Sequence, residues 1–203
     1  MTEIPHLRLF FALGLPLYLA EELIRRFREQ TNPNLRWTRP ERLHLTLRFW
    51  GHFAADRIPK LISAGQAAAA KSEALPLHVD SLGAFPSQAR ARVHWAGIGE
   101  PGRSVLCRLA TRLDDELAHR GIARESRPFR PHLTVARVRT RMKSEPPGRS
   151  PGPGINPDRV ELQGLRWTAQ GLLLVESRLT PHPTYEILDC ADFAAHGSRG
   201  EAP

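Results

Sequence analysis

The sequence predicts an α+β protein made of two similar halves, and three observations lead to that fold class. Segments with strand patterns alternate with segments of helical periodicity along the chain. The order of these segments is similar before and after about residue 90, which indicates an internal repeat. One four-residue pattern also occurs once in each half. We therefore expect a bilobal fold of two pseudo-symmetric lobes, each with a mainly antiparallel sheet backed by helices, and a cleft between them.

The first half opens with a predicted buried strand over residues 8–13, which is followed by a helix. Pro16 suits the first turn of that helix. Its apolar residues at helical spacing are Ala20, Leu23, Ile24 and Phe27. A second strand is predicted over residues 43–50, where β-favouring residues lie between a proline and a glycine. Residues 56–70 follow as a helix, because Asp56 can cap an alanine-rich segment.

The rest of the chain holds five further predicted strands and one strongly amphipathic helix. The strands share β-favouring composition between turn residues and cover residues 75–82, 91–98, 132–138, 172–179 and 185–190. Residues 83–88 are expected to form the turn between the first two of them. The helix has leucines at helical spacing, namely Leu106, Leu109, Leu113 and Leu117. Gly121 follows its predicted end.

The length of 203 residues predicts one domain, over residues 1–193. Residues 140–158 are rich in proline and glycine and are expected to be a long loop. Residues 194–203 are expected to be a loose tail. Hydrophobic residues make up 41% and charged residues 25% of the chain, which excludes a disordered chain, a collagen and a coiled coil.

The charge and the cysteines limit the partners and the compartment. The formal net charge is +8, and arginine forks match phosphate oxygens, which fits a phosphate or RNA partner. A genomic bias toward arginine codons explains the charge equally well. Cys107 and Cys190 are too few for a disulfide scaffold and fit a reducing compartment.

The apolar run over residues 9–20 superficially resembles a signal peptide. Glu3 in the would-be basic region and Pro16 within the run argue against one, and the run is too short to span a bilayer. We therefore expect a cytoplasmic protein with no membrane contact. We also expect a monomer with no protein partner and no cofactor.

The repeated pattern is His-apolar-Thr-apolar, at residues 44–47 and 132–135. Two such matches arise by chance in only about a few of a thousand chains of this composition. In a strand, residues i and i+2 share a face. His44 and Thr46 are therefore expected on one face, with apolar residues behind them, and His132 with Thr134 likewise. Two such strands side by side would present two imidazoles and two hydroxyls to one point.

This set of groups suits hydrolysis of a phosphodiester. In-line displacement at phosphorus uses a base on the attacking side and an acid on the leaving side, and histidine can be either near neutral pH. Threonine hydroxyls can donate to the non-bridging oxygens, where negative charge is held. Arg130 and Arg137 flank the second motif and could add positive charge. A metal site on His44 and His132 has little support, because no acidic residue or second histidine follows either at ligand spacing.

The chain resembles the 2H phosphoesterase superfamily, in particular the RNA 2′,3′-cyclic phosphodiesterases, also called the 2′–5′ RNA ligase family. The resemblance rests on four segments: RLFFALGLP at 8–16, LHLTLRFWG at 43–51, ARVHWAGI at 91–98 and RPFRPHLTVARV at 127–138. It implies a bilobal fold with the active site in the central cleft. It also implies metal-independent hydrolysis of a terminal 2′,3′-cyclic phosphate to a 2′-phosphate.

Carried onto this chain, the resemblance implies that His44 is the general acid and His132 the general base. It places Thr46 and Thr134 at phosphate-binding positions and Arg137 at a basic position that holds the nucleotide phosphate. The substrate would be RNA with a 2′,3′-cyclic phosphate end, or a cyclic nucleotide.

Several further side chains fit roles in substrate binding. Among the aromatic candidates for stacking on a base (Trp37, Phe49, Trp50, Phe85), we favour Phe49, at the end of its strand. His94 could face the cleft, because it alternates with Val93 and Trp95. Arginines that could guide an RNA backbone cluster around the motifs: Arg36, Arg39, Arg42, Arg48, Arg127, Arg130, Arg137, Arg139 and Arg141.

Two alternatives to this function stay open. The same fold and basic face could form a non-catalytic RNA-binding module, or 2′–5′ RNA ligation could be the main activity. The two histidines separate catalysis from binding, since only catalysis depends on them.

Overall fold

The computed structural model describes residues 4–29, 35–138, 160–179 and 184–194. Its strands are β1 (His6–Gly14), β2 (Leu35–Trp37), β3 (His44–Ala54), β4 (Leu75–Phe85), β5 (Val93–Ile98), β6 (His132–Val138), β7 (Arg166–Ala169), β8 (Gly171–Arg178) and β9 (Thr184–Asp192). Its α-helices are α1 (Leu17–Arg28), α2 (Ile58–Ala70) and α3 (Gly102–His119). Three short 3-10 helices are η1 (Pro40–Arg42), η2 (Ala55–Arg57) and η3 (Gln88–Arg90).

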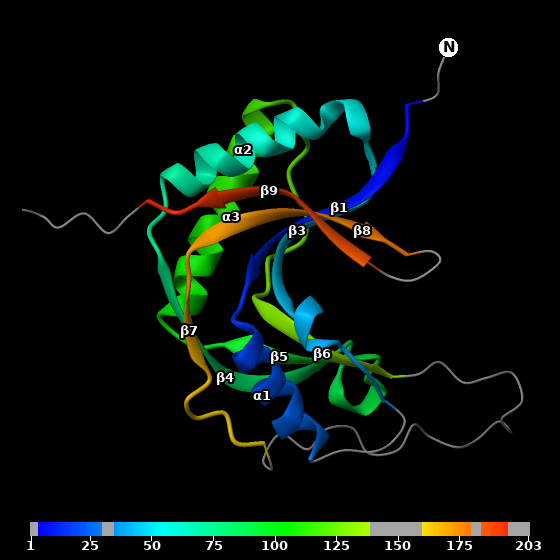
Figure 1. Cartoon of the computed structure of the whole chain (residues 1–203), viewed down its shortest axis with the longest axis vertical. Coiled ribbons are helices and arrows are strands. Elements are labelled where there is room, and N and C mark those ends of the chain that lie inside the picture. The colour runs from blue at the N-terminus through cyan, green and yellow to red at the C-terminus, as the bar shows by residue number, and fades with distance from the viewer. Residues whose placement is uncertain (1–3, 30–34, 139–159, 180–183, 195–203) are drawn as a thin grey trace, which may run out of the picture.

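The strands of the described residues form one curled sheet (Figure 1). Its order is β7-β4-β5-β6-β3-β1-β8-β9, with β2 paired to the side of β6, and every pairing between named strands is antiparallel. The predicted α+β class with antiparallel strands is confirmed. We expected two separate sheets, but β3 and β6 pair at Leu45 and Leu133 and so join the strands into one. The division into two pseudo-symmetric lobes stays a prediction.

The helices bury the stripes that their spacing predicts. In α1 the four predicted positions are buried together with Leu19, and in α3 all four leucines are buried. Helix α2 contacts α3, β8 and β9, and α3 also contacts β4. Figure 1 shows α2 and α1 at opposite ends of the molecule. One large hydrophobic cluster contains residues from all three helices and from most strands.

Several local features differ from the predictions. Asp56 lies in η2 and does not cap α2, which begins at Ile58 without a side-chain cap. Strands β2 and β7 have only three and four residues, too short to show a periodic pattern. β4 continues to Phe85, so residues 83–85 belong to a strand and not to the predicted turn. Gly83 can stay in that strand because it has no side chain: a Cβ there would lie 2.0 Å from Cζ2 of Trp95.

The predicted 140–158 loop lies outside the described residues, as does the predicted tail beyond Ala194. Ala194 itself is fixed, because its N–H donates to the carbonyl of Ser72 at 2.8 Å. Ala194, the first residue of the predicted tail, thus contacts the rest of the fold, and the 1–193 domain limit stays a prediction. No helix among the described residues is both long enough and apolar enough to cross a bilayer.

Candidate active site

The two repeated motifs lie on adjacent strands, β3 and β6. Leu45 pairs with Leu133, and both side chains are buried in the core. Continuing this antiparallel register by one residue in each direction puts each histidine beside the threonine of the other motif, on the opposite face from the leucines. The sequence predicted two imidazoles and two hydroxyls on a common face, and the register of β3 and β6 has this arrangement.

Each histidine ring is held by an equivalent hydrogen bond to the backbone. Nδ1 of His44 lies 2.7 Å from the carbonyl oxygen of Arg42, and Nδ1 of His132 lies 2.7 Å from that of Arg130. A carbonyl oxygen only accepts, so each Nδ1 must carry the proton. Nε2 of each neutral ring is then the free acceptor. This fixes which nitrogen of each imidazole is available to exchange a proton with a substrate.

A β-bulge follows each threonine and changes which residues share the histidine face. Phe11 pairs with Arg48 but Ala12 with Thr46, so Leu47 is the extra residue in β3. Likewise Val135 is the extra residue in β6, between the residues that pair with His94 and Trp95. A bulge shifts the alternation by one residue. The residues five positions after each histidine therefore face the same side as that histidine.

Those two residues are Phe49 and Arg137, both proposed as substrate contacts from the sequence. Phe49 pairs with Phe10, whose ring stacks on the imidazole of His44 with centroids 4.6 Å apart. The guanidinium of Arg8 lies over the ring of Phe49, 4.4 Å from its centroid. Arg137 is exposed, and its charge lowers the pKa of His132, which places the two groups near each other. The strict alternation of an unbulged strand would have placed both on the opposite face.

Arg130 has a different contact from the predicted one. It is exposed, and its backbone carbonyl, rather than its guanidinium, binds the ring of His132. Its predicted substrate contact therefore stays a prediction.

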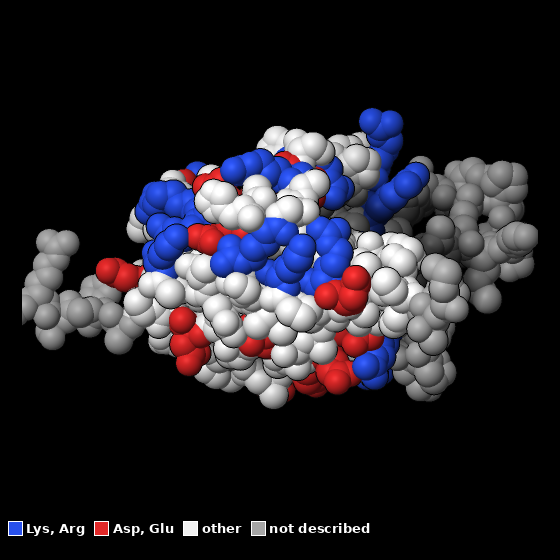
Figure 2. Space-filling view, turned by 90° about the horizontal axis from the view of Figure 1, so that it is seen from above, with Lys and Arg blue, Asp and Glu red and all other residues white. Residues whose placement is uncertain are grey.

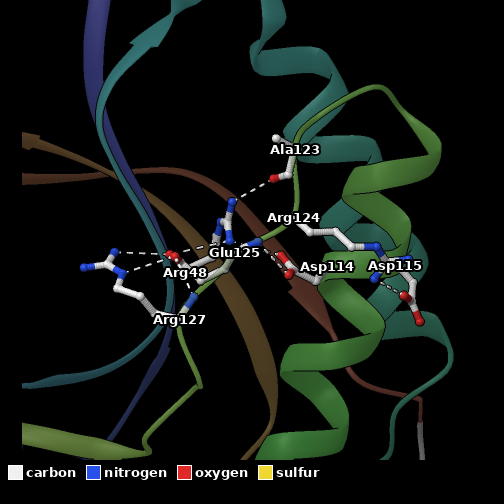
Figure 3. A network of polar contacts seen from close by, with 7 residues as sticks. All are labelled: Arg48, Asp114, Asp115, Ala123, Arg124, Glu125 and Arg127. Carbon is white, nitrogen blue, oxygen red and sulfur yellow. Dashed lines mark hydrogen bonds and ion pairs between the residues drawn. The ribbon is translucent and has the colours of Figure 1, made fainter.

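Arg48, expected to guide RNA, lies on the other face because of the bulge. Its side chain is only 9% exposed, and its guanidinium lies 3.4 Å from Asp114 and 3.5 Å from Glu125. It also donates a 2.8 Å hydrogen bond to the carbonyl of Ala123 (Figure 3). Arg127 pairs with Glu125 at the edge of the same network. Arg48 therefore ties β3 to α3 and to the segment that leads into β6, and it is not a substrate-facing arginine.

Aromatic rings surround both histidines, and the sequence analysis identified only part of this set. His44 contacts Phe10 and also the edge of Tyr185, with centroids 5.4 Å apart. His132 contacts Phe85 at 5.1 Å and Trp95 at 6.3 Å. Phe85 was a candidate from the sequence, while the other three were missed. Register pairing could have indicated Phe10 and Trp95, but only the fold brings Tyr185 of β9 to the first motif.

The two tryptophans considered for base stacking lie elsewhere. Trp50 packs against Phe11 and Phe53 on the core side. Trp37 lies under the guanidinium of Arg28, 5.7 Å from it. Neither has a described contact with the histidine face.

Burial lowers the pKa of both motif histidines below 6.5. The hydrogen bonds to the backbone carbonyls oppose this shift, and for His44 the charge of His132 lowers the pKa further. The positive charge of Arg137 acts on His132 in the same direction. These shifts favour the neutral form of both imidazoles, and an anion bound between them would favour a proton on one of them.

His94, which the sequence left as a candidate for the cleft, faces the core. It is 1% exposed, and its register partner is Ala136 rather than Thr134. Its Nε2 has no hydrogen-bond partner, and burial lowers its pKa. Among the described residues, no group of three or more His, Cys, Asp or Glu side chains is placed to hold a metal ion.

Basic charge is not confined to the histidine face. Figure 2 looks onto the side where α2 lies in Figure 1 and shows Lys and Arg in a band, with acidic residues beside them. Glu116 of α3 pairs with Lys71 at 2.6 Å and with Arg120 at 2.7 Å, which lowers its pKa to about 2. Some of the basic residues therefore form ion pairs within the fold, so the positive charge alone does not indicate an RNA partner.

Comparison with known proteins identifies the family of this chain. The family model of the LigT-like phosphoesterases matches residues 18–95 and 98–185. The match therefore continues beyond residue 138, where the resemblance seen in the sequence ended. An RNA 2′,3′-cyclic phosphodiesterase of Escherichia coli is 33% identical over 73% of this chain and 79% of its own length. One of Thermus thermophilus is 28% identical over 96% of this chain and 93% of its own length.

Solved structures agree. The structure of TT0787 of Thermus thermophilus has a TM-score of 0.74 and 27% identity, covering 94% of this chain and all of that one. E. coli LigT in complex with 3′-AMP has a TM-score of 0.69 and 28% identity, covering 93% and 98%. The protein is thus an enzyme of the phosphoesterase class. More particularly, the chain belongs to the LigT-like phosphoesterase family.

Proposed function

We propose that this enzyme hydrolyses the 2′,3′-cyclic phosphate at an RNA end to a 2′-phosphate, without a metal ion. The observation that carries the proposal is the pair of identically held imidazoles on one face of β3 and β6, each with Nε2 free. The relatives in E. coli and T. thermophilus carry the name of this activity, and the E. coli structure binds 3′-AMP, a nucleotide with a 3′-phosphate. The proposed catalytic unit is a single domain over residues 1–193.

The reaction needs a base that takes a proton from water and an acid that gives a proton to the leaving oxygen. Nε2 of His132 accepts a proton from water, which attacks phosphorus on the side opposite O3′. Nε2 of His44 gives its proton to O3′ as the P–O3′ bond breaks, leaving the phosphate on O2′. Arg137 favours the neutral form of His132, which suits a base.

Burial lowers the pKa of His44 and so disfavours its protonated form. The cyclic phosphodiester carries one negative charge and stabilises that proton on binding. The active protonation state thus forms with the substrate in place.

The remaining side chains hold the phosphate. The hydroxyls of Thr46 and Thr134 lie beside the histidines and donate to the non-bridging oxygens. Arg137 adds a charge-assisted hydrogen bond on the His132 side. Because the two imidazoles supply both proton transfers, the mechanism needs no Lewis acid.

The test is hydrolysis of an oligoribonucleotide with a 2′,3′-cyclic phosphate end in excess EDTA, with wild type beside His44→Ala and His132→Ala. We expect activity in the wild type alone, with all three proteins equally folded by their melting temperatures. Activity that disappears with EDTA and returns with zinc or manganese would contradict the metal-free mechanism. Tight RNA binding by all three without hydrolysis would favour the RNA-binding module. Net joining of RNA ends would favour the ligase.

A further inference from the structure

Arg8 is an exposed arginine on the histidine face with no carboxylate partner among the described residues. It lies in β1 next to Leu9, which is fully buried on the opposite side of the strand. Its only described contact is the ring of Phe49, over which its guanidinium lies at 4.4 Å. A guanidinium held over an aromatic face keeps all its N–H donors free for an anion at its edge.

The position of Arg8 relative to His44 follows from two contacts. Phe10 stacks on His44 and pairs with Phe49. The ring of Phe49 in turn contacts the guanidinium of Arg8. Arg8 is two residues from Phe10 along β1, a separation of about 6.6 Å between their Cα atoms. The guanidinium therefore lies on the same face as the proposed acid, one step farther along the strand.

The geometry of the proposed reaction indicates which part of the substrate lies near Arg8. Water attacks on the His132 side, so O3′ and the ribose lie on the His44 side. The rest of the RNA chain continues from the 5′ oxygen of that ribose, and the next negative charge is the phosphodiester upstream. A cation for that charge belongs on the His44 side.

We propose that Arg8 binds the phosphodiester one nucleotide upstream of the cyclic phosphate, and that Phe49 positions it there. This inference rests on the proposed function and on His44 as the acid. It predicts that the enzyme prefers an RNA end to a free cyclic nucleotide, and that this preference depends on Arg8. It also changes the role of Phe49, whose ring face carries Arg8 and not a base.

The test compares two substrates, a 2′,3′-cyclic mononucleotide and an oligoribonucleotide with the same terminal base and cyclic phosphate. Four variants are compared with the wild type: Arg8→Gln, Arg8→Lys, Phe49→Leu and Arg108→Gln. Arg108 is the matched control, because it is exposed on α3 and its loss changes the net charge equally. Melting temperatures verify that each variant is folded.

We expect Arg8→Gln to lower kcat/KM about tenfold on the oligonucleotide and less than about twofold on the mononucleotide. The slope of log kcat/KM against log salt for the oligonucleotide should fall by about 0.7, the value for one phosphate contact on a single strand. Arg8→Lys should retain most of the preference, Phe49→Leu should lose about threefold, and Arg108→Gln should match the wild type.

An equal loss on both substrates, or no loss on either, would overturn the role of Arg8. A wild type inactive on both substrates would instead reject the proposed function itself. The two failures are therefore distinguishable within one set of measurements.

Discussion

The strand pairs that carry the two histidines, β1–β3 and β5–β6, match position by position. A glycine lies opposite each histidine, since Gly14 pairs with His44 and Gly97 with His132. Each motif has a bulge after its threonine, and each histidine donates Nδ1–H to the carbonyl two residues before it. The features common to both are those that any proton-transferring imidazole needs: a fixed ring and a free Nε2.

The two strand pairs differ in the residues after the bulge. The fifth position after the histidine is Phe49 in β3 and Arg137 in β6, so only His132 has a cation directly from its own strand. The fourth position is Arg48 in β3 and Ala136 in β6, and both lie on the core side. On the proposed mechanism, these differences keep the proposed base, His132, neutral and leave the proposed acid, His44, dependent on the charge of the substrate.

The largest expected effect is the loss of activity in the two histidine variants, and a change of leaving group distinguishes their roles. His44→Ala and His132→Ala should each lower kcat on the natural ester by about a thousandfold. A substrate with sulfur in place of O3′ needs no proton on departure, because a thiolate is a good leaving group. It should restore most of the activity of His44→Ala and none of that of His132→Ala. Rescue of His132→Ala instead would show that His132 is the acid and His44 the base.

Arg48 should have the next largest effect, on stability. Arg48→Leu leaves Asp114 and Glu125 without their buried cation, and the free energy of unfolding should fall by about 2 kcal/mol. The fall is smaller than for a fully buried pair, because both carboxylates are partly exposed. Urea unfolding measures it, with Arg124→Gln, an exposed ion-pair variant on the same segment, as the control. Equal values for the two variants would show that the network adds no stability.

Arg137 should affect both binding and the pH profile. Arg137→Gln should lower kcat/KM about tenfold through the lost phosphate contact. The wild-type bell in kcat/KM should be centred below pH 6.5, because burial lowers the pKa of both histidines. Removing the positive charge raises the pKa of His132, so the acid limb should move to higher pH. An acid limb that stays in place would show that the charge of Arg137 does not act on the group that serves as the base.

The smallest expected effect compares the two glycines opposite the histidines. A Cβ on Gly97 would lie 2.3 Å from Oγ of Ser81, whereas one on Gly14 would lie 3.7 Å from Cδ1 of Leu173. Gly97→Ala should therefore cost about 1 kcal/mol of stability and Gly14→Ala close to none. Melting temperatures would show the difference. A larger cost at Gly14 would mean that this strand is the less adaptable one.

Much of this structure could be predicted from the sequence, and the failures have physical causes. Periodicity located the helices and the longer strands, because their buried stripes repeat over several turns or residues. Alternation placed His44 and His132 on a common face but gave the wrong side for Arg48. The bulge leaves no mark in the hydrophobic pattern, since Leu43, Leu45 and Leu47 are buried in unbroken alternation. The contact of Tyr185 depends on the pairing of β9 and β8, which no local pattern specifies.

The most direct test of the central claim is the position of the phosphate in the product. An oligoribonucleotide with a 2′,3′-cyclic phosphate end is treated with metal-free wild-type enzyme, and the product is analysed for 2′- and 3′-phosphate. In-line attack with His44 protonating O3′ predicts the 2′-phosphate alone. A 3′-phosphate, or a mixture of the two, would contradict the placement of the acid beside O3′.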